Sequence, residues 1–300
     1  MTMHAGAPIS IRPLKAWHEY LAAEELQRTV WQMPDWRDAV PANLMITVNK
    51  NGGLVLGAFE ADGRLVGLAF GFIGVEGAQH YKHCSHMLAV LPEYREQGIG
   101  ILLKLKQREE TLARGIDLMT WTYDPLQARN ANLNLAHLGA IARRYVENAY
   151  GEMTDGLNAG LASDRFEAEW WLNAARVKTC VAGQPLVFDW DALVRAGAQS
   201  VFRVSMDARG VPRIDDEAEL GGEPLLVEIP ASLNAVKAAS LDLAREWRVR
   251  TRAVFQRAFA AGYAAVGFVF TTRGDHTRAA YVLSRAPVET GASLPQNHTE

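Results

Sequence analysis

The sequence predicts an α+β fold built from two parts. The clearest β signal is a hairpin, because the apolar runs 54–59 and 65–70 are joined at Asp62-Gly63, a turn dipeptide that tolerates positive φ. Apolar residues recur at helical spacing elsewhere, as in residues 17–30, and strand-like and helix-like runs alternate along the chain. A length of 300 residues exceeds one average domain and suits two.

The order of these runs predicts where the two parts divide. The first part is expected to contain a strand at 9–11, a helix at 17–30, the hairpin, a strand at 83–90, a helix at 98–114, a strand at 117–123, a helix at 130–138 and a hairpin of 141–146 with 166–172. Composition shifts at 176–185, so we expect domains at 1–176 and 177–300. The second is expected to be α+β, with strands at 200–206, 224–229, 263–270 and 279–283 around one helix from Ser232 to Ala261.

Composition and charge exclude several classes of function. The hydrophobic fraction of 49% and charged fraction of 22% are those of an ordinary globular protein, and a net charge of −3 gives no field that would attract nucleic acid. Cys84 and Cys180 form no Cys-x-x-Cys pair, which predicts neither a disulfide framework nor a metal site. Residues 1–8 lack an export signal and no run of 18 apolar residues occurs. We therefore expect a cytoplasmic protein with no membrane contact.

The segment from Arg95 to Gly100 predicts an anion-binding cradle. It lies between a strand-like run and a helix-like run, where two glycines let the backbone turn sharply and the first N–H groups of a helix can bind phosphate oxygens. A plain helix cap is the alternative. A dinucleotide-binding loop would need glycine where Leu103 stands, and a Walker loop would need glycine before Lys104 or Lys106. Neither of those motifs is present.

The pattern Arg-x-x-Gly-x-Gly after a strand and Pro92 resembles the acyl-CoA signature of the GNAT N-acetyltransferase superfamily. The resemblance, which covers about residues 8–175, implies the GNAT fold, a mixed and mostly antiparallel sheet flanked by helices, with acetyl-CoA as co-substrate. It implies a strand splayed from its parallel neighbour, so that the backbone of Leu88, Ala89 and Val90 pairs with the pantetheine arm. It further implies that the pyrophosphate is bound by Arg95, Glu96, Gln97, Gly98, Ile99 and Gly100, and that Asn134 contacts the cofactor.

Acetyl transfer to an amine requires a base, and His86 is the leading candidate because imidazole titrates near neutrality. A hydrogen-bonded structural histidine is the alternative. Asp124 is a second candidate for base or amine anchor, although Asp-Pro also opens ordinary turns. Many GNAT members use a tyrosine as acid four residues before a glycine, and Leu135 stands at that place here. Tyr123 and Tyr145 are the available substitutes.

The predicted function is direct acetyl transfer from acetyl-CoA to the amine of a small-molecule acceptor, without a metal. The missing tyrosine leaves a second class open: a non-catalytic protein of GNAT fold that binds or senses coenzyme A. Three roles are open for residues 177–300, namely closure over the acceptor, formation of a homodimer, and a degenerate second GNAT half.

Overall fold

The computed structural model describes residues 8–34, 36–77, 80–151, 160–273 and 276–286. These residues form two compact units. The first contains the described residues up to Trp121 together with Gly160, and the second contains those from Thr122 to Gly151 and from Leu161 onward. Each unit combines a sheet with helices, so the expected α+β class is confirmed.

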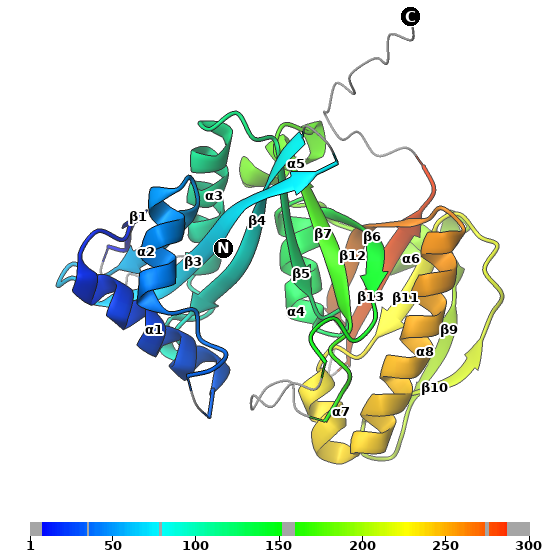
Figure 1. Cartoon of the computed structure of the whole chain (residues 1–300). Helices are drawn as coiled ribbons and strands as arrows, with labels where there is room; N and C mark the ends of the chain where they lie inside the picture. The colour runs from blue at the N-terminus through cyan, green and yellow to red at the C-terminus, as the bar shows by residue number, and fades with distance from the viewer. Residues whose placement is uncertain (1–7, 35, 78–79, 152–159, 274–275, 287–300) are drawn as a thin grey trace, which may run out of the picture. The chain divides into compact units, whose positions relative to one another are not determined.

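The first unit contains the hairpin and the strand that precedes the cradle (Figure 1). Its strands are, in spatial order, β1 (Ser10–Pro13), β2 (Leu54–Phe59), β3 (Leu65–Glu76), β4 (His80–Val90) and β5 (Leu118–Tyr123). The last two residues of β5 belong to the second unit. Its helices are α1 (Trp17–Trp31), α2 (Ala42–Lys50) and α3 (Ile99–Leu112), with a 3₁₀ turn η1 (Pro92–Tyr94). The predicted hairpin and both flanking strands are confirmed, whereas α2 was not predicted.

Strands β1 to β4 pair antiparallel, and β5 pairs parallel with β4 through a short ladder. That ladder consists of His83 with Met119 and Cys84 with Thr120, so β4 runs on from Ser85 to Val90 without a β5 partner. On its other edge β4 stays paired with β3 up to Val90. One edge of the strand therefore opens where the cradle begins.

Helix α3 is held close to the sheet by a glycine in β3. A Cβ atom on Gly67 would lie 3.1 Å from Leu103 Cδ1 and 3.2 Å from Ile99 Cγ2, closer than nearly all such contacts. Both α3 side chains are almost fully buried. The absence of a side chain at this position therefore allows α3 to pack tightly behind the cradle.

The second unit carries the rest of the chain. Its main sheet has the order β7-β6-β12-β13-β11-β8, and β9 and β10 form a separate antiparallel pair. The strands are β6 (Ile141–Val146), β7 (Arg165–Trp171), β8 (Gln199–Ser200), β9 (Phe202–Met206), β10 (Pro212–Glu217), β11 (Leu225–Ile229), β12 (Ala264–Arg273) and β13 (His276–Ser284). The helices are α4 (Ala128–Ala131), a π-helical turn η2 (Asn132–His137), α5 (Ala175–Val181), α6 (Trp190–Arg195), α7 (Leu233–Ala239) and α8 (Leu241–Ala260).

The hairpin of β6 and β7 belongs to this second sheet. Ala142 of β6 pairs with Ala265 of β12, and Phe166 of β7 packs against aromatic rings of α8 and β13. The compact units thus divide at a different place from the boundary expected after Arg176. Whether residues 1–176 fold alone stays a prediction.

The single long helix predicted from Ser232 to Ala261 is wrong. Ser240 adopts an extended conformation (φ −165°, ψ 120°) and divides the segment into α7 and α8. Its hydroxyl accepts a hydrogen bond from the Leu243 amide at 3.2 Å, and Ser232 caps α7 in the same way through Ala235. The second serine is a strong N-cap signal that the apolar periodicity concealed.

Candidate functional site

The cradle forms where β4 passes through η1 into α3. Gly98 is the N-cap of α3 and has a left-handed conformation (φ 78°, ψ 0°), which favours glycine, and no side chain caps the helix. The first N–H groups of a helix have no partner within it, and the helix dipole makes them attractive to anions. A Cβ atom on Gly98 would meet nothing within 4 Å, and on Gly100 only Leu88 Cδ2 at 3.9 Å. The start of α3 is therefore open to a ligand.

Three of the remaining cradle residues are exposed around this opening, whereas Ile99 is buried. Arg95, Glu96 and Gln97 are all at the surface. The Arg95 Nε donates to the Val90 carbonyl at 3.4 Å, and the Gln97 amide donates to the Glu93 carbonyl at 3.2 Å. These bonds tie the loop to the end of β4 and leave charged and amide groups beside the helix start.

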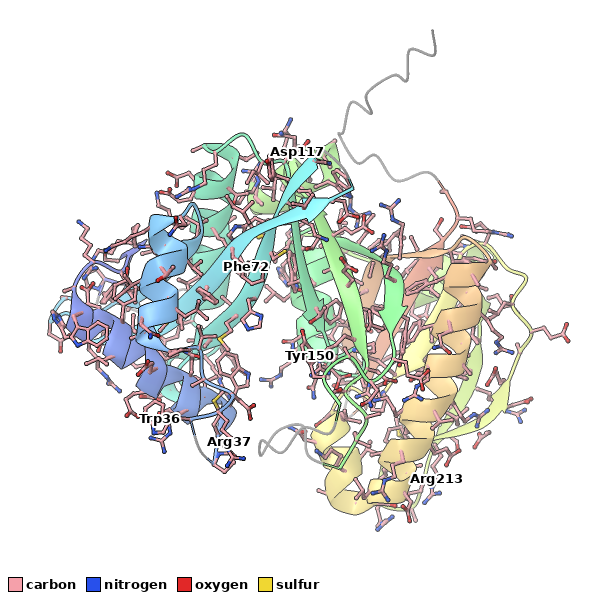
Figure 2. All side chains as sticks on the ribbon, viewed as in Figure 1. Trp36, Arg37, Phe72, Asp117, Tyr150 and Arg213 are labelled. Atoms are coloured by element: carbon pink, nitrogen blue, oxygen red, sulfur yellow. The ribbon has the colours of Figure 1, made fainter. Side chains whose placement is uncertain are left out.

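His86 stands at a β-bulge in β4. The register between β3 and β4 shifts from Phe70–Met87 to Gly71–Ser85, so His86 is the extra residue. Bulges of this kind redirect a side chain and often adjoin active sites. The His86 ring lies edge-on to Phe70, with ring centroids 5.9 Å apart, and its centroid is 6.2 Å from that of Phe72, which is 40% exposed. The side chain of Phe72 is labelled in Figure 2. Desolvation lowers the pKa of His86, which favours the neutral imidazole that can accept a proton.

A buried polar network on α3 and β4 was missed by the sequence analysis. The Lys104 Nζ donates to Ser85 Oγ at 2.7 Å, and Ser85 donates to Gln107 Oε1 at 2.9 Å. The Gln107 amide in turn lies 3.0 Å from His83 Nε2. Burial lowers the pKa of Lys104 to about 7, and burial together with the Lys104 charge lowers the pKa of His83 to about 3. His83 is thus neutral and is held as a hydrogen-bond acceptor.

Asp124 lies in the second unit as half of a buried ion pair. Arg248 of α8 donates Nη1 and Nη2 to the two carboxylate oxygens at 2.8 and 2.6 Å. The same carboxylate accepts the Leu126 amide at 2.8 Å, as in an Asx turn. A carboxylate with these three donors is well suited to hold the turn after β5 and poorly suited to bind an incoming amine.

We expect Arg248→Met to lower the free energy of unfolding by about 3–5 kcal/mol, because Asp124 would remain buried without its countercharge. Chemical denaturation measures the change. Arg245→Met is the matched control on α8, since its partner Asp242 is 90% exposed and such pairs contribute less than about 1 kcal/mol. Equal small losses in both variants would contradict a structural role for the Asp124 pair. The double variant Asp124→Asn/Arg248→Met should recover part of the loss.

The two tyrosines considered as acids are also in the second unit. Tyr123 is 5% exposed, and burial raises its pKa. Tyr145 donates to Asp164 Oδ2 at 2.5 Å, and burial followed by the Asp164 carboxylate raises its pKa. Asn134, predicted to contact the cofactor, is 4% exposed within the π-helical turn η2. The roles predicted for the two tyrosines as acids and for Asn134 as a cofactor contact stay predictions.

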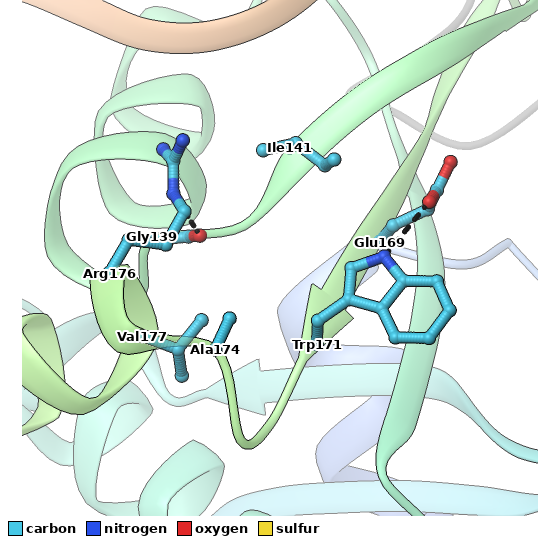
Figure 3. A pocket seen from close by; sticks show the side chains of 7 residues that line it. All are labelled: Gly139, Ile141, Glu169, Trp171, Ala174, Arg176 and Val177. Atoms are coloured by element: carbon cyan, nitrogen blue, oxygen red, sulfur yellow. Dashed lines mark hydrogen bonds between the residues drawn. The ribbon is translucent and has the colours of Figure 1, made fainter. Parts of the chain in front are cut away.

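A small depression in the second unit is shown in Figure 3. Its empty volume is about 160 Å³. The residues that line it are Gly139, Ile141, Glu169, Trp171, Ala174, Arg176 and Val177. Arg176 closes it on one side by donating Nε to the Gly139 carbonyl at 2.9 Å, and the Trp171 indole donates to Glu169 at 3.1 Å. Part of this volume is open solvent, and the depression encloses no space for a water-sized molecule, so it is too small for a coenzyme.

No cluster of three or more His, Cys, Asp or Glu residues within the described ranges could hold a metal ion. None of the helices in those ranges is both long and apolar enough to cross a bilayer.

No protein-family model matches the chain, and no curated protein matches its sequence. Among solved structures, the ribosomal-protein-S18-alanine N-acetyltransferase from Escherichia coli is 16% identical, with 56% of this chain and 96% of that chain covered and a TM-score of 0.44. An N-acetyltransferase from Staphylococcus aureus Mu50 is also 16% identical, with 56% and 100% covered and a TM-score of 0.44. A chain of the NatC complex bound to Gag peptide and CoA is 15% identical, with 54% and 96% covered and a TM-score of 0.44. Over a little more than half of its length, the chain is similar to these N-acetyltransferases.

Proposed function

We propose that the protein is an acyl-CoA-dependent N-acetyltransferase that transfers an acetyl group directly from acetyl-CoA to the amine of a small-molecule acceptor. The observation that carries the proposal is the uncapped start of α3 directly beyond the open edge of β4. A helix start binds a pyrophosphate, and an open strand edge binds an extended amide chain. Coenzyme A has both groups in one molecule.

The open edge of β4 suits the pantetheine arm. Leu88, Ala89 and Val90 pair with β3 on one side only, and the arm can supply the missing hydrogen-bond partners on the other. The pyrophosphate would then lie on the amides from Arg95 to Gly100, with Gly98 and Gly100 leaving space for it. The low number of cysteines is in keeping with a cytoplasmic location.

His86 is the residue that we assign as general base. It lies on β4 at the bulge, it is exposed, and its pKa is lowered by desolvation. Asp124 is less suitable as a base because Arg248 binds its carboxylate, and Tyr123 is less suitable as an acid because it is buried. His86 would take the proton of the attacking amine as the C–N bond forms.

We expect His86→Ala to lower kcat by about 10²-fold and to leave the affinity for acetyl-CoA unchanged, because only general-base catalysis is lost. The wild-type rate should fall as the pH drops through the pKa of His86, below the usual histidine value of about 6.5, and the variant should lack this limb. His18→Ala, at an exposed site on α1, is the control and should keep the wild-type profile. Loss of the folded state in His86→Ala would show instead that this histidine is structural.

The proposal is tested by calorimetry with acetyl-CoA and by thiol release across a panel of amines. Binding with amine-dependent release of thiol supports it, and no binding refutes it. A second function, a non-catalytic module that binds coenzyme A, is favoured by Leu135, which is fully buried where a tyrosine acid would stand. Binding without thiol release for any amine would favour that module.

A further inference from the structure

Leu135 stands where the resemblance places a tyrosine acid for the departing thiolate of coenzyme A, and the first unit offers another way to stabilise this thiolate. A leaving thiolate can be stabilised by a proton or by a positive charge placed beforehand in a site of low dielectric constant. Such a role rests on the proposed function, because it concerns the leaving group of that reaction.

Lys104 places an amine at the closed end of the gap between β4 and β5. Its Nζ lies 2.7 Å from Ser85 Oγ on β4, 3.8 Å from Met119 Sδ on β5 and 3.7 Å from the centroid of the Trp121 ring. Ser85 and Trp121 are the first residues beyond the last ladder pair, Cys84–Thr120. The amine therefore bridges both strands at the point where they separate.

Among the described residues, the contacts of this amine include no carboxylate. Its contacts are Ser85, Gln107, Met119 and the face of Trp121, and Lys104 itself is 2% exposed. The titratable group nearest in the network is His83, which burial, Lys104 and Arg114 keep neutral. A buried ammonium without a carboxylate partner is costly, and an anion that arrives beside it would be strongly stabilised.

We propose that the ammonium of Lys104 stabilises the thiolate of coenzyme A as the acetyl group leaves. From Val90 to Ser85 the unpaired edge of β4 spans five residues, about 17 Å at ~3.3 Å per residue, a length that an extended pantetheine arm can cover. The sulfur would then reach the closed end of the gap. This charge was not foreseen as part of the site, because a lysine in a helix is ordinarily exposed.

The electrons and protons balance without a further reactant. The amine nitrogen forms a bond to the acetyl carbon, the C–S bond breaks with its electron pair on sulfur, and the amine proton passes to His86. The thiolate stays beside Lys104 until it takes a proton from solvent as coenzyme A departs. The adjacent thiolate favours the protonated form of the amine, so Lys104 acts through its charge.

The test is an ultraviolet titration of the thiol of coenzyme A bound to the wild type, to Lys104→Met and to Lys106→Met. Lys106 is the matched control in α3, since it pairs with Glu109 and Glu110 at the surface. We expect the bound thiol to have a pKa about one unit or more below the usual value of about 8.5 in the wild type and in Lys106→Met. In Lys104→Met it should return to or above that value, and kcat should fall about tenfold or more with KM nearly unchanged.

A wild-type complex whose thiol titrates at or above the usual value overturns the proposal, whatever the variants do. The same thiol pKa in the wild type and in Lys104→Met also overturns it. Coenzyme A lacking its sulfur should bind the wild type and both variants equally, which shows that the cradle is intact. Failure of the wild type to bind coenzyme A at all would refute the proposed function, whereas binding with an unshifted thiol refutes only the role of Lys104.

Discussion

Gly100→Glu is expected to abolish the binding of acetyl-CoA and to leave the fold intact. Gly100 is the second residue of α3 and has no positive φ, and its Cβ position meets only Leu88 at 3.9 Å. A glutamate therefore fits the helix, but its carboxylate would occupy the place where the pyrophosphate is proposed to bind. Repulsion between the two anions adds to the steric block, so the affinity should fall at least about 10³-fold, on the order of 4 kcal/mol.

Gly100→Ala is the matched control for this substitution. Alanine is the better helix former by about 1 kcal/mol, and the added methyl group has room, so the variant should be as stable as the wild type and should still bind acetyl-CoA. Gly98 is less suitable for the comparison, because its left-handed φ would strain any replacement. Calorimetry on the folded variants measures both affinities. An unchanged affinity in Gly100→Glu would exclude the cradle as the coenzyme site.

Local patterns predicted much of the first unit. The hairpin of β2 and β3 was predicted from its turn and its apolar runs, and the cradle from two glycines between a strand and a helix. These signals depend on neighbouring residues, which the sequence shows directly. The α+β class and the mostly antiparallel sheet, which were also expected, are confirmed by the structure.

Contacts between distant residues account for what was missed. Asp124 was a candidate base because it follows a strand, and its partner Arg248 stands 124 positions away. Lys104 was considered only when a Walker motif was excluded. Nothing in the local sequence shows that Ser85, Met119 and Trp121 surround its amine. The pairing of β6 with β12 was not foreseen either, because it joins residues far apart in sequence.

The contacts of β7 argue that residues 1–176 will not fold alone. Phe166 of β7 is fully buried, with ring centroids 4.7 Å from Phe255 of α8 and 5.2 Å from Tyr281 of β13. Asp164 is also fully buried and is bound by Arg252 at 2.8 and 3.0 Å. All three partners lie beyond residue 176, as does Arg248, the partner of Asp124.

Truncation after Arg176 is therefore expected to give an unfolded or insoluble fragment, contrary to a boundary at that residue. The fragment lacks the aromatic partners of Phe166 and the arginines that pair with Asp124 and Asp164. Loss of the packing of one buried aromatic residue alone costs about 3–5 kcal/mol. This single loss is already a large share of the roughly 5–15 kcal/mol that holds a typical domain folded. Circular dichroism and size-exclusion chromatography of the fragment measure the outcome, and co-expression with residues 177–300 is the control that should restore a soluble complex. A monomeric fragment that unfolds cooperatively and binds acetyl-CoA would show instead that residues 1–176 are a domain of their own.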